Sequence, residues 1–126
     1  MRPFQELVVW QKAHQLALAV YHESRAFLGD ERFGLTSQLR RSAVSIPANI
    51  AEGSARPGET EFRRFLGIAL GSATELEYHL ILSRDLGYIS RDTHARLDVP
   101  LAAVKRMLVA FIRRLQDAPP PRPTDS

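Results

Sequence analysis

One predicted helix carries polar residues at a spacing that can build a site. Its members, at intervals of four, three, four and three residues, are Gln38, Ser42, Ser45, Asn49 and Glu52. On an α-helix this spacing places the five side chains in one stripe, about 100° from the apolar stripe of the same segment. The polar stripe could line a groove, form hydrogen bonds to a neighbouring helix, or be ordinary solvated surface. The sequence leaves these interpretations open.

A shorter polar stripe, Ser72, Glu75 and His79, lies in the third predicted helix. Di-iron bundles use a Glu-x-x-His motif on each of two helices, whereas Glu75 and His79 are four residues apart and no second pair exists. The chain also lacks a Gly-x-Ser-x-Gly turn and a glycine-rich phosphate loop. We therefore predict no metal site, no cofactor and no enzymatic activity. Nothing in the sequence favours acid–base use of Glu52 or Glu75.

Basic residues occur as adjacent pairs on three predicted helices: Arg40-Arg41, Arg63-Arg64, Lys105-Arg106 and Arg113-Arg114. Neighbouring residues on a helix diverge by about 100°, so one pair cannot act as a single clamp. Collected on one face of a ring of subunits, the pairs would form a basic surface that binds phosphates without base specificity. Alternatively, they are solvated arginines balanced by nearby acidic residues such as Glu59, Glu61 and Asp117.

Composition limits the class of protein. The 126 residues, 44% hydrophobic and 25% charged, suit one globular domain. The absence of cysteine excludes disulfides and thiolate zinc sites. The net charge of +3, with 15 arginines and two lysines, permits contact with nucleic acid but does not require it. No apolar stretch approaches the ~20 residues of a membrane span, and the first residues lack the apolar core of a signal peptide, so we expect a soluble cytoplasmic protein.

Four segments show the helical period. They cover residues 6–28, 35–53, 59–86 and about 91–118, each with apolar residues at intervals of three and four. Short connections between them predict an all-α, up-down-up-down four-helix bundle. We expect one domain of residues 1–118, followed by a proline-rich, disordered tail of residues 119–126.

Residues that favour helix ends delimit these segments. The predicted boundaries are Gly29-Asp30 after the first helix, Thr36 or Ser37 at the start of the second, a stop and loop at residues 52–58 after it, Gly87 after the third and Ser90 before the fourth.

Prolines and glycines also fall inside the predicted helices. Pro47 predicts a kink near residues 43–46, and Pro100 either kinks the fourth helix or marks its true start. Gly67 and Gly71 each cost about 1 kcal/mol relative to alanine in a helix interior. They therefore predict close approach of another helix, within the chain or across a subunit boundary.

Four stretches, at residues 7–13, 33–43, 45–53 and 65–77, resemble the 23S rRNA intervening-sequence protein family. The run Ser-Ile-Pro-Ala-Asn-Ile-Ala-Glu-Gly at 45–53 is the most specific of them. The resemblance extends over about residues 4–115 and leaves out the proline-rich tail.

The resemblance implies a small four-helix bundle that assembles as a homopentamer. The family is also similar to the accessory variability determinants of diversity-generating retroelements, which bind nucleic acid and a reverse transcriptase. No catalytic residues are established for the family, and its motif residues Gln38, Asn49, Glu52, Ser72 and Glu75 coincide with the polar stripes. The leading hypothesis is a non-enzymatic oligomer that binds RNA or DNA. The alternative is an assembly scaffold that binds another protein and no nucleic acid.

Overall fold

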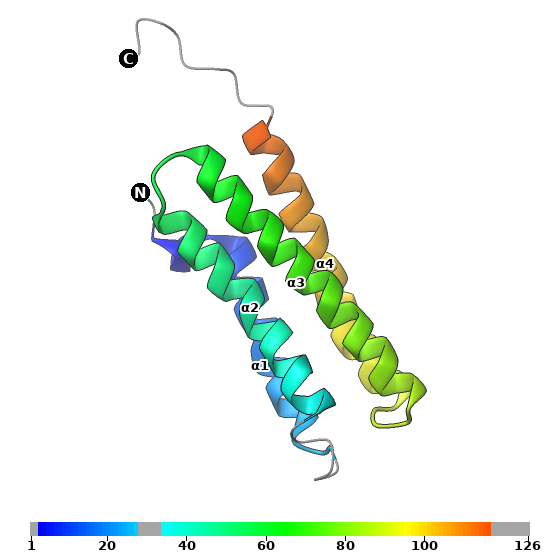
Figure 1. Cartoon of the computed structure of the whole chain (residues 1–126). Helices are drawn as coiled ribbons and strands as arrows, with labels where there is room; N and C mark the ends of the chain where they lie inside the picture. Colours follow the sequence, from blue (N-terminus) through cyan, green and yellow to red (C-terminus); the bar gives the residue numbers. More distant parts are fainter. Residues whose placement is uncertain (1–2, 28–33, 117–126) are drawn as a thin grey trace, which may run out of the picture.

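The chain folds into four helices and a short 3₁₀-helix (Figure 1). The structure is a computed structural model that describes residues 3–27 and 34–116. Its elements are η1 (Phe4–Glu6), α1 (Val8–Ser24), α2 (Leu35–Ala55), α3 (Glu59–Asp85) and α4 (Arg91–Gln116). No strand occurs among the described residues, so the predicted all-α bundle is confirmed.

Helices that follow one another in the chain lie side by side. α2 packs between α1 and α3, α4 packs on α3, and α1 packs against α4, whereas in the described part of the chain the Cα atoms of diagonally opposite helices stay more than 8 Å apart. With short connections between antiparallel neighbours, this is the up-down-up-down arrangement. None of the described helices is both long and apolar enough to span a bilayer.

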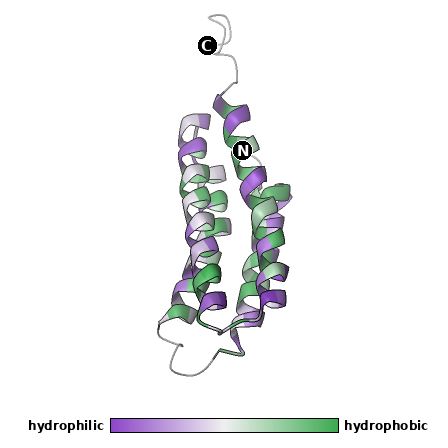
Figure 2. Ribbon diagram, turned by 90° about the vertical axis from the view of Figure 1, so that its right-hand side faces the viewer, coloured by the Kyte–Doolittle hydropathy of each residue, from purple (hydrophilic) through white to green (hydrophobic). Residues whose placement is uncertain are grey.

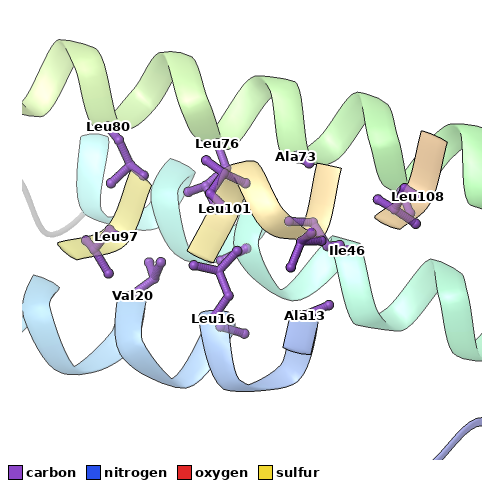
Figure 3. Close-up of a cluster of buried hydrophobic side chains, with 14 of the residues drawn as sticks. Ala13, Leu16, Val20, Ile46, Ala73, Leu76, Leu80, Leu97, Leu101 and Leu108 are labelled. Carbon is purple, nitrogen blue, oxygen red and sulfur yellow. The ribbon is translucent and has the colours of Figure 1, made fainter. Parts of the chain in front are cut away.

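The core forms where the four apolar stripes meet. Figure 3 shows side chains from all four helices, among them Leu16, Leu76 and Leu101, converging on one interior space. These three leucines are at most 2% exposed, and burial of such a side chain contributes about 1.5–3 kcal/mol. Hydrophobic and hydrophilic residues alternate around each helix in Figure 2, as expected for helices that bury one face.

Gly53 lies inside α2 rather than ending it, because the helix continues to Ala55. The end of the helix at Ala55 falls within the predicted stop and loop at residues 52–58. The glycine is buried, and a Cβ atom built on it would lie 2.6 Å from the Cβ of Phe65 on α3. Real Cβ atoms do not approach one another this closely, so the missing side chain is what lets α2 and α3 meet.

The predicted boundaries of α3 and α4 are confirmed. Gly87 follows the end of α3 in the left-handed region, at φ +80°, and donates its N–H to the carbonyl of Arg84. Ser90 precedes α4 and its hydroxyl accepts the backbone N–H of Thr93 at 3.0 Å.

The start of α2 differs from the prediction. Thr36 and Ser37 both lie in the first turn of the helix, which begins after Gly34, and no side chain caps it. The prediction of either residue as the N-cap is wrong, because Leu35 already lies in the helix and is buried.

The first helix is shorter than predicted at both ends. The stretch around Glu6 forms η1, Leu7 is extended, and α1 itself covers only Val8–Ser24. The predicted stop at Gly29-Asp30 lies outside the described residues, as does the proline-rich tail of residues 119–126.

Both internal prolines lie within continuous helices. α4 begins at Arg91, so the alternative that Pro100 marks its start is wrong. Pro47 is buried in α2, and the kink predicted beside it stays a prediction.

Gly67 and Gly71 lie on the exposed side of α3. A Cβ atom added to either glycine would meet no atom of the described chain within 4 Å. Close packing within the chain is therefore the wrong explanation for this pair. Close approach across a subunit boundary stays a prediction.

The two kinds of glycine give opposite predictions. We expect Gly53→Ala to lower the free energy of unfolding by about 1–3 kcal/mol, because the methyl group must displace Phe65. Gly71→Ala is the control and should raise it by up to about 1 kcal/mol, since its methyl group meets nothing in the chain. Urea unfolding followed by circular dichroism measures both. Equal midpoints for Gly53→Ala and the parent would contradict the close-approach explanation.

Candidate functional site

The two polar stripes meet along the seam between α2 and α3. The hydroxyl groups of Ser45 and Ser72 lie 2.7 Å apart, and Ser42 Oγ lies 3.3 Å from His79 Nδ1. Because the helices are antiparallel, residues 42 and 45 of α2 face residues 79 and 72 of α3. The structure therefore places these side chains in hydrogen bonds across a helix–helix seam.

Asn49 orders the hydrogen bonds at the Ser45 end of the seam. Its Nδ2 donates to the carbonyl of Ser45 at 2.8 Å and to Ser45 Oγ at 3.0 Å. Ser45 Oγ thus accepts from Asn49, and either hydroxyl can be the donor in the hydrogen bond between Ser45 and Ser72.

Ser42, His79 and Glu75 have the residue types of a nucleophile, a base and an orienting acid. Ser42 Oγ lies 3.0 Å from the carbonyl of Gln38 and 3.1 Å from that of Leu39. A hydroxyl has one proton, and these carbonyls take it, so the oxygen accepts a hydrogen bond from His79 Nδ1–H. In that arrangement His79 would donate to Ser42 rather than take its proton, and the serine is only 3% exposed.

The other ring nitrogen of His79 points toward the outer edge of the seam. Its Nε2 lies 3.9 Å from a carboxylate oxygen of Glu75, a separation longer than a hydrogen bond. Among the described residues, no three or more histidine or acidic side chains are grouped so that they could hold a metal ion.

The remaining predicted stripe residues lie at the exposed edge of the seam. Gln38 is exposed, and Glu52 forms an ion pair with Arg56 at 3.0 Å on the surface. Exposed pairs of this kind contribute little to stability. The structure thus joins Ser42, Ser45, Asn49, Ser72 and His79 in the seam and leaves Gln38, Glu52 and Glu75 in contact with solvent.

The predicted basic residues do not gather at one place. Arg40-Arg41 lie near the start of α2, whereas Arg63-Arg64 and Arg113-Arg114 lie at the opposite end of the bundle, where α3 begins and α4 ends (Figure 1). Within a single chain, the eight cations therefore form no continuous surface.

Three of the eight cations form side-chain hydrogen bonds or ion pairs inside the chain. Arg40 donates to Ser24 Oγ at 2.9 Å and its guanidinium lies 4.7 Å from the centre of the Tyr21 ring. Lys105 forms an ion pair with Glu77 at 2.8 Å. The third, Arg64, pairs with an acidic residue of its own helix.

The hydrogen bond between Arg64 and Glu61, 2.7 Å long, lowers the pKa of the glutamate and raises the pKa of the arginine. Both side chains are exposed and charged at neutral pH. The charge of Arg64 is thus largely balanced where it stands, which makes this residue a weak candidate for binding phosphate.

The other five candidates, Arg41, Arg63, Arg106, Arg113 and Arg114, form no ion pair within the described part of the chain. Three of them belong to the last three turns of α4, where residues 105–116 include no acidic residue. We call Lys105, Arg106, Arg113 and Arg114 the α4 basic strip. Three members, Lys105, Arg106 and Arg113, line a shallow depression of about 350 Å³ together with Val109 and Ala110, whereas the guanidinium of Arg114 lies 5.1 Å from the centre of the Phe111 ring.

The sequence interpretation missed an apolar groove at the same end of the bundle. Two adjoining depressions of about 420 and 430 Å³ share Leu7 and Phe111 as lining residues. We call them together the end groove; its apolar lining is completed by Val8, Val9, Phe62, Met107, Ala110 and Leu115. Helix length is the feature that could have indicated this groove. α4 has 26 residues and α1 only 17, so α1 is too short to cover the whole of α4.

Exposed apolar residues on α1 and α2 were also missed. Leu18 is 58% exposed, Val44 43% and Tyr21 41%. Tyr21 lies beside Arg40, and in antiparallel helices this contact places Leu18 level with Val44. The sequence shows these residues as apolar positions outside the buried stripes, without showing that they lie together.

Known proteins share both the sequence pattern and the fold. The model of the 23S rRNA-intervening sequence protein family matches residues 5–110. A crystal structure of a protein of unknown function from the S23 ribosomal protein family of Bacteroides thetaiotaomicron VPI-5482 is 28% identical, with a TM-score of 0.79. The match covers 84% of this chain and 99% of that chain. No curated protein sequence matches.

The seam can be tested with a double-mutant cycle. We expect Ser45→Ala and Ser72→Ala each to lower the free energy of unfolding by about 1 kcal/mol, and the double variant to lose less than the sum by at least about 0.5 kcal/mol. Ser54→Ala is the control for Ser45→Ala, because Ser54 Oγ bonds only to the carbonyl of Ala51 in its own helix. It should be additive with Ser72→Ala. If the effects of the Ser45 and Ser72 variants are additive, the hydrogen bond between the two residues contributes nothing to the free energy of unfolding.

Proposed function

Because the chain belongs to the 23S rRNA-intervening sequence protein family, we propose that it is a non-enzymatic, homo-oligomeric bundle that binds nucleic acid through the α4 basic strip. Five copies in the oligomer and a cytoplasmic location are what the resemblance and the composition lead us to expect. The similarity to the accessory variability determinants of diversity-generating retroelements also stays a prediction.

The observation that carries the binding proposal is the unbalanced charge at the end of α4. Arg106 and Arg113 are exposed, are separated by two helical turns, and have no acidic partner in the described chain. Arg63, also without an ion pair, lies at the same end of the bundle. Arginines spaced along one helix suit contacts to successive phosphates and carry no base specificity.

The outer face of α3 supports self-association. Gly67 and Gly71 make this face flat, and nothing inside the chain requires either glycine. Ile68 and Tyr78, on the exposed side of the same helix, are 41% and 59% exposed. A second copy packed on this face would bury both side chains and would account for the glycines.

The alternative function is a scaffold that binds another protein and no nucleic acid. The exposed side chains of Leu18 and Val44 favour it, since apolar residues that lie together on a surface suit a protein partner. In that case the cations of α4 serve solubility only.

Nucleic-acid binding predicts a specific dependence on salt. We expect Arg106→Glu with Arg113→Glu to weaken binding of a labelled RNA hairpin or DNA duplex at least about ten-fold in 0.1 M salt, measured by fluorescence anisotropy. The slope of log affinity against log salt should fall by about two, because two phosphate contacts are lost.

The matched control is Arg25→Glu with Arg91→Glu, which changes the same charge at the other end of the bundle. It should leave both affinity and slope closer to those of the parent. Binding that is absent at low salt, or that does not weaken as salt rises, contradicts the proposal and favours the scaffold. Comparison of the two ligands decides between RNA and DNA.

Self-association predicts a solution mass several-fold above the 14.2 kDa of one chain. Gly71→Leu and Ile68→Glu should each lower the mass measured by light scattering while the circular dichroism spectrum stays helical. Val99→Glu, at a position 69% exposed on α4, is the control and should leave the mass unchanged. A parent chain that is monomeric at micromolar concentration rules out the oligomer.

A further inference from the structure

A shallow depression of about 320 Å³ lies where α2 begins beside α1. Its lining residues are Tyr21 of α1 and, from the first two turns of α2, Thr36, Ser37, Arg40 and Arg41. Among the described residues no acidic side chain lines it, and the first acidic residue of α2 is Glu52, near the other end of the helix. Hydroxyl and guanidinium groups thus surround one small space.

Thr36 has a hydroxyl group that the fold leaves without a partner. The residue is only 4% exposed, and its Oγ1 forms no hydrogen bond in the part of the chain that the structure describes. A buried polar atom without a partner costs free energy, and an ordered water or an ion is a common explanation for one. Since no hydrogen bond fixes the hydroxyl, rotation about χ1, between the two rotamers that threonine adopts in helices, can present it to a ligand in the depression that Thr36 lines.

Arg40 is positioned at one wall of the depression. Its Nε–H donates to Ser24 Oγ at 2.9 Å, and its guanidinium carbon lies 4.7 Å from the centre of the Tyr21 ring. These contacts orient the guanidinium but engage only part of its five N–H groups. Apart from a long contact of 3.5 Å between Nη2 and the carbonyl of Tyr21, the others have no acceptor among the described residues. An arginine oriented in this way suits the oxygen atoms of a phosphate.

The end of α2 adds to the positive potential of the depression. Gln38 is the first residue of the helix whose N–H reaches a carbonyl four residues back, that of Gly34 at 3.2 Å, and no side chain caps the helix. The N–H groups of Thr36 and Ser37 therefore have no acceptor within α2. The N-terminal end of this 21-residue helix also carries a partial positive charge, which favours a bound anion.

We propose that this depression binds a phosphate group. The phosphate oxygens accept hydrogen bonds from the hydroxyl of Thr36 and from the free N–H groups of Arg40, and the exposed Arg41 adds a second positive charge. A bound phosphate explains the unpartnered hydroxyl, which neither the packing of the bundle nor the α4 basic strip explains. The depression lies at the opposite end of the bundle from Arg113 and Arg114, so the two surfaces bind independently.

Titration of the full chain with inorganic phosphate tests the proposal. We expect the amide signals of Thr36, Ser37 and Arg41 in isotopically labelled protein to shift and to saturate as phosphate is added. Sodium chloride at the same ionic strength should leave them in place. If phosphate leaves these three signals unchanged, or shifts them no more than chloride does, the inference is overturned.

A substitution that keeps the shape of the side chain tests the role of the hydroxyl. We expect Thr36→Val to weaken phosphate binding at least about five-fold, because one hydrogen bond to the anion is lost. The melting temperature should not fall, since the variant removes an unpartnered polar atom from the interior. Thr74→Val is the matched control, because Thr74 Oγ1 bonds to the carbonyl of Leu70 in its own helix, and it should leave phosphate binding unchanged.

A second pair of variants tests the charge. Arg41→Gln should weaken phosphate binding at the amide signal of Thr36, whereas Arg106→Gln, which removes an exposed arginine from α4, should not. If Thr36→Val binds phosphate as tightly as the parent chain does, the hydroxyl contacts no ligand and the inference is overturned.

Two oligonucleotides identify the source of the phosphate group. The parent chain and Thr36→Val are each titrated with a short single strand that carries a 5′-phosphate and with the same strand lacking it. Weakened binding of both strands assigns the depression to the nucleic-acid backbone, and weakened binding of the phosphorylated strand alone assigns it to the terminal phosphate. If only inorganic phosphate binds more weakly, the ligand is the free ion. The α4 variants are measured separately, so this site and the proposed function can fail independently.

Discussion

The close approach of α2 and α3 is the constraint on which the rest of the structure depends. A single missing side chain, at Gly53, lets the backbone of α2 approach Phe65. Along the same interface Ala43, Ala69 and Ala73 are fully buried, and their short side chains keep the two helix axes near one another. Only at this separation can hydroxyl groups as short as those of Ser45 and Ser72 reach across the seam. The polar network is thus a consequence of small residues in the layer beneath it.

The unequal lengths of α1 and α4 determine where the end groove and the α4 basic strip lie. α1 covers α4 only as far as Leu108, whereas α4 continues for two more turns. The residues of those turns have no helix on one side, so their apolar face lines the end groove and their polar face carries the α4 basic strip. Both features therefore arise from one cause. In the other half of α4, Arg96 pairs with Glu23 on α1, which shows how the presence of that helix neutralises a cation.

The periodic elements of the fold could be predicted because a buried stripe repeats every three or four residues whatever its partner. The hydrogen bond of Ser90 and the left-handed Gly87 could be predicted for the same reason, since both act within a few residues of the chain. Gly53 could not, because a glycine that ends a helix and one that admits a neighbour look alike in sequence. The ion pair of Arg64 with Glu61 is local, whereas that of Lys105 joins residues 28 positions apart and depends on the packing of α3 against α4.

The features that the single chain leaves unexplained lie on adjacent helices. The glycines and Ile68 occupy the outer face of α3, and the unpaired arginines occupy the outer face of α4. An oligomer joined through the α3 face would carry several copies of the α4 basic strip, each on the helix next to the contact. One strip offers few phosphate contacts and binds weakly, whereas strips held together by the assembly engage one nucleic acid at high effective concentration. Self-association and binding are then coupled: loss of the α3 contact weakens the hold on nucleic acid even though every arginine is still present.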